Sequence, residues 1–172
     1  MKGSRARLGT LLICVVAAAA LVAFVVVGLA GSSGGSDGRP APPLPREQLS
    51  GEVVTLGALR GRPVLVTFWA SWCGPCGEEA PALERFSRDL DGRATLVGIN
   101  WSDPSLSNAR AFIKRHRWTF PNLRDSQGTV GAEYGLSGLP TTFVIDSAGT
   151  VRATLRGPQT QQTLTRALAS VK

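Results

Sequence analysis

Residues 68–82 read FWASWCGPCGEEAPA, and this stretch holds Cys73 and Cys76, two of the three cysteines of the chain. The apolar run VLVTFW (64–69) leads into it, which is typical of a central strand covered on both faces. Apolar residues at helical spacing follow the pair: Leu83, Phe86 and Leu90. The sequence therefore predicts a buried strand, a short turn that carries the cysteines, and a helix that begins at them.

The spacing of the two cysteines suits a dithiol that cycles through a disulfide. Residues three apart at a helix start lie on one face, so the sulfur atoms of Cys73 and Cys76 can meet. Pro75 suits the first helical turn, where its missing N–H is not needed. Cys73 would lie at the helix N-terminus, where free N–H groups and the helix dipole favour the thiolate that attacks disulfides.

Other uses of a C-x-x-C pair fit the sequence less well. A structural zinc site needs four ligands, whereas the chain has no second cysteine pair and a single histidine, His116. An inert structural disulfide across so short a loop gains little chain entropy. Copper delivery would draw on a further soft or imidazole ligand. We expect no metal and no cofactor, with these uses as the alternatives.

Two motifs resemble the thioredoxin family. WCGPC (72–76) looks like its active site, and GLPTTF (138–143) resembles the segment that carries the cis-proline of that fold, with Pro140 placed 64 residues after Cys76. Together with an apolar segment near the N-terminus and the stretch GIN (98–100), these motifs look most like membrane-tethered thiol–disulfide oxidoreductases of the TlpA, ResA and DsbE type. The likeness covers about residues 40–172.

The resemblance implies a role for each matching residue. Cys73 would be the attacking thiol and Cys76 the resolving thiol. The surface that binds the substrate would be formed around them by Trp72, Pro75, Leu139 and Pro140. Leu139 and Pro140 would form the wall opposite the sulfur atoms; an ordinary turn proline is the alternative at that position.

Two positions depart from ordinary thioredoxins. Six residues before the first cysteine, where thioredoxins carry a buried aspartate, this chain has Thr67. Glu79, three residues after Cys76, instead matches the acidic residue of the ResA-like group. Helical spacing would bring its carboxylate near the thiols, and burial would raise its pKa so that it exchanges protons with Cys76. An exposed helix glutamate is the alternative.

The remaining pattern predicts an α/β class, which the resemblance makes a thioredoxin-like fold with a central mixed β-sheet flanked by helices on both faces. Apolar runs and one alternating run predict strands near residues 53–56, 64–69, 96–99, 142–145 and 151–156, the last two forming a hairpin. Further helices are expected around residues 109–113, with Ser105 or Ser107 as the cap, around 130–134, and around 164–171.

The N-terminal part of the chain is expected to hold an anchor and a linker. Residues 8–30 carry no charge over 23 positions, and as a helix they would reach roughly 34 Å, enough to span a membrane core of about 30 Å. We therefore expect a cytoplasmic basic N-terminus (1–7), a transmembrane signal-anchor (8–30), a Gly/Ser/Pro-rich linker (31–46) and a thioredoxin-like domain (47–172). A cleaved signal peptide is the alternative to the anchor.

Charge predicts the location and excludes one class of partner. Basic residues precede the apolar segment and none follows it in GSSGGSDG (31–38), so a single-pass protein of the cell membrane with its domain outside the cytoplasm is expected. The chain has a net charge of +7, but residues 47–172 hold 14 basic and 11 acidic side chains. Their densest cluster, Lys114 to Arg117, suits the end of a helix. We expect no nucleic-acid partner.

The direction of electron flow is less strongly encoded. The Gly-Pro dipeptide between the cysteines is that of reducing thioredoxins, near −270 mV, rather than of strong oxidants near about −120 mV. We expect a reductant of extracytoplasmic protein disulfides. The resemblance adds apocytochrome c in cytochrome c biogenesis as a substrate, and a transmembrane thiol electron donor as a partner. The alternatives are a disulfide-forming oxidase of exported proteins and a non-catalytic peptide-binding or metal-carrier module. Ala70 stands where a peroxidase would have a threonine.

Overall fold

Strand β2 (Val64–Trp69) lies inside the sheet, and all six of its residues are buried. It pairs in parallel with β3 (Thr95–Trp101) and antiparallel with β5 (Thr141–Ile145). A strand with neighbours on both sides and helices or loops on both faces has no solvent-facing side, which explains its unbroken apolar sequence. The computed structural model describes residues 38–171, so the expected N-terminus, the expected transmembrane segment and residues 31–37 of the expected linker lie outside it.

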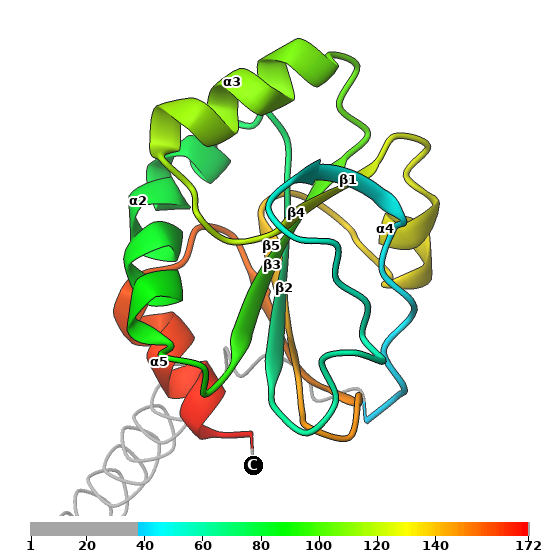
Figure 1. Ribbon diagram of the computed structural model, residues 1–172, viewed down its shortest axis with the longest axis vertical. Coiled ribbons are helices and arrows are strands. Elements are labelled where there is room, and N and C mark those ends of the chain that lie inside the picture. The colour runs from blue at the N-terminus through cyan, green and yellow to red at the C-terminus, as the bar shows by residue number, and fades with distance from the viewer. Residues whose placement is uncertain (1–37, 172) are drawn as a thin grey trace, which may run out of the picture. The chain divides into compact units, whose positions relative to one another are not determined.

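The sheet has six strands in the order β1-β4-β3-β2-β5-β6, with parallel and antiparallel pairs, so the mixed sheet is confirmed (Figure 1). The remaining strands are β1 (Glu47–Ser50), β4 (Asn122–Asp125) and β6 (Val151–Arg156). The helices are α2 (Gly74–Asp89), α3 (Leu106–His116), α4 (Thr129–Glu133) and α5 (Gln161–Ala169). The predicted β5–β6 hairpin forms, and Ser105 caps α3 by accepting a hydrogen bond from the N–H of Asn108.

The two faces of the sheet carry separate apolar cores. Leu65 and Trp69 of β2 pack with residues of α2, α3 and α5 and with both cysteines of the 73–76 pair. Phe68 and its alternate neighbours on β2 pack on the opposite face with Tyr134, which follows α4. The side-chain period of two in a strand thus divides β2 between the cores, and the cysteines belong to the core beneath α2.

The predicted strand near residues 53–56 is wrong. The edge strand ends at Ser50, and the next residue, Gly51, has a φ of +76° with its Cα side packed against Pro121, which turns the chain out of the sheet. Val53 is consequently exposed. Strand β4 was not predicted, because its sequence NLRD shows neither an apolar run nor a clear alternation.

Residues 38–44 pack on the sheet domain, so the folded unit starts before residue 47. The N–H of Gly38 donates to the carbonyl of Val151, and the N–H of Ala41 donates to that of Gly149. The hydroxyl of Tyr134 donates to the carbonyl of Pro42 at 2.8 Å. Within residues 38–171, no helix has the length and apolar character needed to cross a membrane.

Candidate active site

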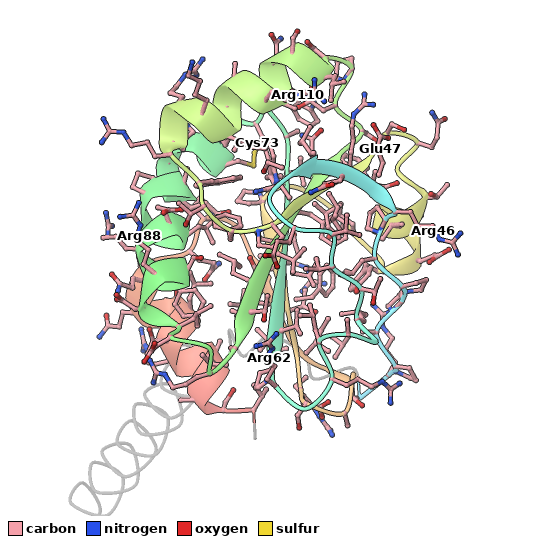
Figure 2. The ribbon with its side chains drawn as sticks, in the orientation of Figure 1. Arg46, Glu47, Arg62, Cys73, Arg88 and Arg110 are labelled. Atoms are coloured by element: carbon pink, nitrogen blue, oxygen red, sulfur yellow. A yellow bond between two sulfur atoms is a disulfide. The ribbon has the colours of Figure 1, made fainter. Side chains whose placement is uncertain are left out.

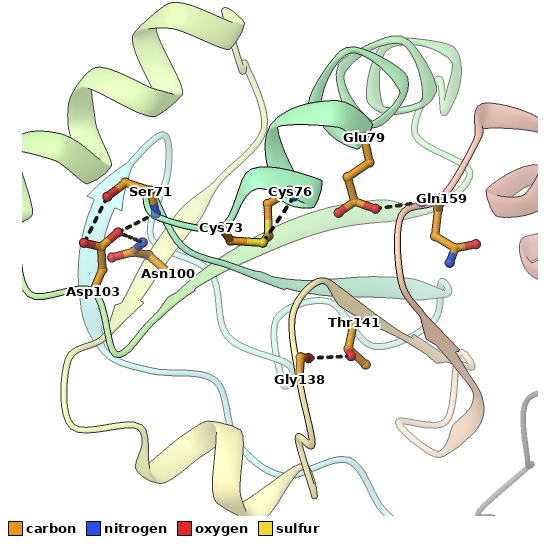
Figure 3. The surroundings of a disulfide bond; sticks show 9 residues. All are labelled: Ser71, Cys73, Cys76, Glu79, Asn100, Asp103, Gly138, Thr141 and Gln159. Atoms are coloured by element: carbon orange, nitrogen blue, oxygen red, sulfur yellow. Dashed lines mark hydrogen bonds between the residues drawn. A yellow bond between two sulfur atoms is a disulfide. The ribbon is translucent and has the colours of Figure 1, made fainter.

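The two cysteines form a disulfide at the start of α2 (Figures 2 and 3). Their Cα atoms lie 5.3 Å apart, as expected for residues on one face of a helical turn. Cys73 is the N-cap of the helix, and its Sγ accepts a 3.2 Å hydrogen bond from the N–H of Cys76. Cys76 is fully buried, whereas Cys73 keeps 6% of its surface exposed. The sulfur of Cys73 is therefore the one that a macromolecular partner can approach first.

The residues predicted to bind substrate border this disulfide. The side chain of Trp72 is 57% exposed, unusual for a large aromatic residue, and Pro75 is also exposed. The Leu139–Pro140 peptide bond is cis. Leu139 packs against the core cluster that contains Cys73 and Cys76. The exposed Trp72 thus adjoins Cys73 in the chain, and the proline turn packs on the core that holds both sulfur atoms. The substrate-binding role of these residues stays a prediction.

The turn that carries the cis-proline is held by its own hydrogen bonds. The hydroxyl of Thr141 donates to the carbonyl of Gly138 at 2.8 Å (Figure 3), and the N–H of Gly157 donates to the carbonyl of Pro140. The backbone N–H and carbonyl of Leu139 make no hydrogen bond within the described residues. These two groups can pair with an extended peptide, as the unpaired edge of a strand does.

Glu79 lies inside the protein, so the alternative of an exposed helix glutamate is wrong. It is 2% exposed, and its Oε2 accepts a 2.8 Å hydrogen bond from the N–H of Gln159, which follows β6 (Figure 3). Its other oxygen has no hydrogen-bond partner among the described residues. Burial raises the pKa of Glu79 to about 7, against the lowering effect of the Gln159 N–H. Near neutral pH this carboxyl can both give and take a proton.

Two buried threonines lie on the same face of the sheet as the cysteines. Thr67, which replaces the buried aspartate of thioredoxins, is the Cα partner of Thr142 across the β2–β5 pair. Both are buried, and neither hydroxyl has a hydrogen-bond partner within residues 38–171. Thr67 alternates with Leu65 and Trp69 along β2, so it points towards α2. Glu79 is therefore a buried carboxyl on this side of the sheet that comes from the helix rather than from the strand.

Asp103 is a site residue that the sequence analysis missed. Its carboxylate accepts hydrogen bonds from the N–H and the hydroxyl of Ser71, at 2.6 and 3.1 Å, and from the side-chain amide of Asn100 at 3.0 Å (Figure 3). It also accepts one from the N–H of Ser105 at the start of α3. Burial alone would raise the pKa of Asp103, but these hydrogen bonds outweigh it and lower the pKa. The only sequence signal was its place just before a helix cap.

An aromatic cluster lies beneath the cysteine turn. The ring of Trp69 stacks on Phe112 of α3 at 4.8 Å and meets Trp118 edge-on at 5.0 Å. The indole N–H of Trp69 donates to Oδ1 of Asn122, and a Cβ at Gly98 would collide with both side chains. Gly98, in the GIN stretch, is thus required by close packing. The cluster fixes the end of β2 from which the cysteine turn departs.

No three His, Cys, Asp or Glu side chains within residues 38–171 are grouped so that they could hold a metal ion. His116 lies against the first turn of α2 instead, with its Nε2 3.9 Å from where a Cβ of Gly77 would be. Burial and the neighbouring Arg115 lower the pKa of His116. The chemistry that this site offers is thiol–disulfide exchange.

A disulfide at the N-terminus of a helix that follows a central parallel strand, bordered by a cis-proline turn, defines an enzyme of the thioredoxin-like thiol–disulfide oxidoreductase class. The sequence profile of the AhpC/TSA family matches residues 38–154 of this chain. The chain therefore belongs to the AhpC/TSA family, and within it to the thiol–disulfide oxidoreductases of the ResA and DsbE type.

Three curated relatives illustrate this relationship. The thioredoxin-like protein YneN of Bacillus subtilis is 33% identical over 130 residues, covering 74% of this chain and 76% of that protein. The thiol–disulfide oxidoreductase ResA of Geobacillus kaustophilus is 34% identical over 133 residues, covering 77% and 76%. The thiol:disulfide interchange protein DsbE of Pseudomonas aeruginosa is 31% identical over 130 residues, covering 76% and 71%.

A solved structure gives the same fold. The DsbF homologue from Corynebacterium diphtheriae superposes with a TM-score of 0.72 at 28% sequence identity, covering 82% of this chain and 94% of that one. The thioredoxin-like arrangement expected from the two motifs is thus confirmed for the described domain.

Proposed function

We propose that the protein reduces selected protein disulfides outside the cytoplasm, with Cys73 as the attacking thiol. The observation that carries this assignment is the difference between the two sulfur atoms. Cys73 reaches the surface at the helix N-terminus beside the exposed Trp72, whereas Cys76 is fully buried behind it. In the dithiol form, the helix N-terminus and the N–H of Cys76 favour a thiolate on Cys73.

The proposed reaction is two exchanges in sequence. The Cys73 thiolate attacks one sulfur of the substrate disulfide, which breaks that bond, releases one substrate thiolate and forms a mixed disulfide. Cys76 then attacks Sγ of Cys73, which releases the second substrate thiolate and leaves the Cys73–Cys76 disulfide. Two electrons pass to the substrate, and two protons complete its thiols at neutral pH. An extended substrate segment would pair with the free backbone groups of Leu139 and lie against Trp72 and Pro140.

Glu79 would take the proton of Cys76 in the second exchange. A buried thiol is a poor nucleophile until it loses its proton, and burial disfavours its charged form. A carboxyl with a pKa of about 7, three residues along the same helix, can accept this proton without leaving the interior. Because the proton would move from the thiol of Cys76 to the carboxylate of Glu79, only one of these two buried groups would carry a negative charge at any time.

The dipeptide Gly74–Pro75 supports the reducing direction, because thioredoxins with this dipeptide have potentials near −270 mV. A thiolate stabilised by many donors makes a couple more oxidising. Within the described residues, one N–H donates to Cys73 Sγ, that of Cys76. This hydrogen bond is made by the oxidised pair, so the reducing direction rests on the dipeptide.

The cellular task that we propose is supported by the names of the relatives and by the expected anchor. Relatives named ResA and DsbE support a role in keeping thiols reduced outside the membrane, with the haem-site cysteines of apocytochrome c as the proposed substrate. A reductant in that location needs a transmembrane thiol carrier to supply its electrons. Cytochrome c content in a deletion strain tests this task, and a normal content would contradict it.

The reduction potential of the Cys73–Cys76 couple tests the direction. The full chain would be equilibrated against glutathione or dithiothreitol buffers, and the fraction of disulfide measured by trapping free thiols. We expect a value at or below about −230 mV, within the range of reducing couples. A value above about −180 mV would make the protein a disulfide donor for exported proteins instead.

A further inference from the structure

The outer surface of α3 carries four exposed basic side chains, which we call the cationic face of α3: Arg110, Lys114, Arg115 and the capping residue Arg117. The helix contains no acidic residue, and none of the four makes an ion pair within the described part of the chain. Arg110 and Lys114 fall at i and i+4 on one side of the helix, and Arg117 follows them as its left-handed C-cap.

The four residues of this face account for the net positive charge of residues 47–172. Residues 47–172 hold 14 basic and 11 acidic side chains; without these four, 10 basic residues face 11 acidic ones and the net charge becomes −1. A helix C-terminus offers roughly half a negative charge to its last turn, far less than four cations, and Arg110 lies outside that turn. The helix dipole therefore does not explain the cluster.

The helix that carries the cationic face packs beside the cysteine turn. The buried side of α3 places Phe112 on the ring of Trp69, at the end of β2 that leads to the cysteines. His116 touches the first turn of α2 at Gly77, the residue after Cys76. Figure 2 shows Arg110 and Cys73 at the same end of the molecule. Glu78, the exposed carboxylate that follows this first turn, offers one negative charge against four positive ones.

We propose that the cationic face of α3 docks an acidic segment of the protein substrate, next to the disulfide that the substrate presents to Cys73. This inference rests on the proposed function and adds the charge of the preferred substrate. Opposite charges beside a reactive group raise the rate of productive encounter, by 10-fold or more at low ionic strength. The rate at which an uncharged small disulfide is reduced should not depend on this face.

A protein segment fits the geometry better than an anionic membrane. The chain enters the described domain at Gly38, which pairs with Val151 at the start of β6. The start of β2 lies at this same end of the sheet, since Val64 and Val151 both pair with Ile145. The cysteines follow the other end of β2, about 20 Å away for six strand residues. The cationic face thus lies at the end remote from the incoming chain.

The test uses two synthetic peptides with the same internal disulfide, one flanked by three glutamates and the other by three lysines. The reduced full chain, in a neutral detergent, should reduce the acidic peptide roughly tenfold faster at 10 mM salt. The ratio should approach one at 1 M salt, where the Debye length falls from about 30 Å to about 3 Å. Equal rates at low salt would overturn this inference alone. Failure to reduce either peptide would overturn the proposed function together with it.

Charge variants locate the effect. The pair Lys114→Glu and Arg115→Glu should remove the preference, whereas the matched pair Arg60→Glu and Arg62→Glu, both exposed in the loop before β2, should keep it. Unchanged reduction of neutral hydroxyethyl disulfide shows that the α3 variant is folded. If it does not fold, the milder pair Lys114→Gln and Arg115→Gln should reduce the preference about threefold. The assignment would be contradicted if the Arg60/Arg62 variant also lost the preference. It would equally be contradicted if the two peptides were reduced at equal rates while α3 was needed for binding to phosphatidylglycerol vesicles.

Discussion

The backbone N–H of Ser71 donates a 2.6 Å hydrogen bond to Oδ2 of Asp103, across 32 positions of sequence. Ser71 lies two residues before Cys73, and Asp103 lies two residues before the cap of α3. One carboxylate therefore joins the cysteine turn to the start of the helix that packs over it. The exposed Trp72 follows Ser71 directly, so this contact holds the backbone beside it.

Replacing Asp103 by alanine should destabilise the protein by about 3 kcal/mol, because four donors from three residues lose their acceptor. Ser71→Ala should lose only about 1 kcal/mol, since the backbone N–H of residue 71 keeps its bond. Urea unfolding of the two variants measures the difference. Equal losses would show that Asp103 does not hold the turn.

Replacing Glu79 by glutamine should change how stability depends on pH. The pKa of Glu79 is about 7 in the folded protein and 4.5 for the ordinary group, so between these values the native state binds more protons than the unfolded chain. The free energy of unfolding of the oxidised wild type should fall by about 3 kcal/mol as pH rises through this window. Glu79→Gln should lack that fall while still accepting the Gln159 N–H.

Glu78→Gln is the matched control, because Glu78 is an exposed neighbour on the same helix. Its unfolding free energy should follow the wild-type curve between pH 4.5 and 8. Denaturant midpoints at several pH values compare the three proteins. Parallel curves for wild type and Glu79→Gln would refute the raised pKa.

Replacing Gly98 by alanine should destabilise the protein by about 2–3 kcal/mol. The new Cβ would lie 3.0 Å from Nε1 of Trp69 and 2.9 Å from Cγ of Asn122, and closer still to Oδ1 of Asn122, so their hydrogen bond must shift. Gly57→Ala is the control, since its nearest neighbour is 3.9 Å away. Thermal unfolding and tryptophan fluorescence should change for residue 98 and not for residue 57.

The two cysteine variants should behave differently towards oxidised glutathione. Cys76→Ser keeps the sulfur that is partly exposed and should accumulate a mixed disulfide, because nothing resolves it. Cys73→Ser keeps the fully buried sulfur and should react far more slowly. Intact-mass measurements over time give both rates. Faster reaction at Cys76 would reverse the assigned order of attack.

Local patterns were enough to predict the elements that carry the cysteines. The apolar run of β2, the spacing after Cys76 and the alternation in β6 each reflect one neighbourhood of the chain, and all three were confirmed. The edge strand was misplaced by several residues because Val53 and Val54 favour a strand intrinsically, whereas the turn at Gly51 decides where the chain leaves the sheet. Propensity yields to tertiary context at such edges.

The missed parts of the site depend on contacts between distant residues. Asp103 meets Ser71 across 32 positions, and Asn122 meets Trp69 across 53. Neither side chain belongs to a motif, and each stands in a polar stretch that resembles a surface loop. The sequence allowed Glu79 to be either buried or exposed. The N–H of Gln159, which holds the buried carboxylate, lies 80 residues further along the chain.

The strap at Gly38–Ala41 and the C-terminal residues leave the domain from the same pole: the strap pairs beside the β5–β6 turn, and the chain ends below α5 (Figure 1). The cysteines occupy the opposite pole. A fusion partner, a surface linkage or an affinity tag joined to the domain at residue 38 or 171 would therefore leave the end with the disulfide facing away from it. In such an attachment, the end of the domain that holds the cysteines would face the solution and the substrates in it.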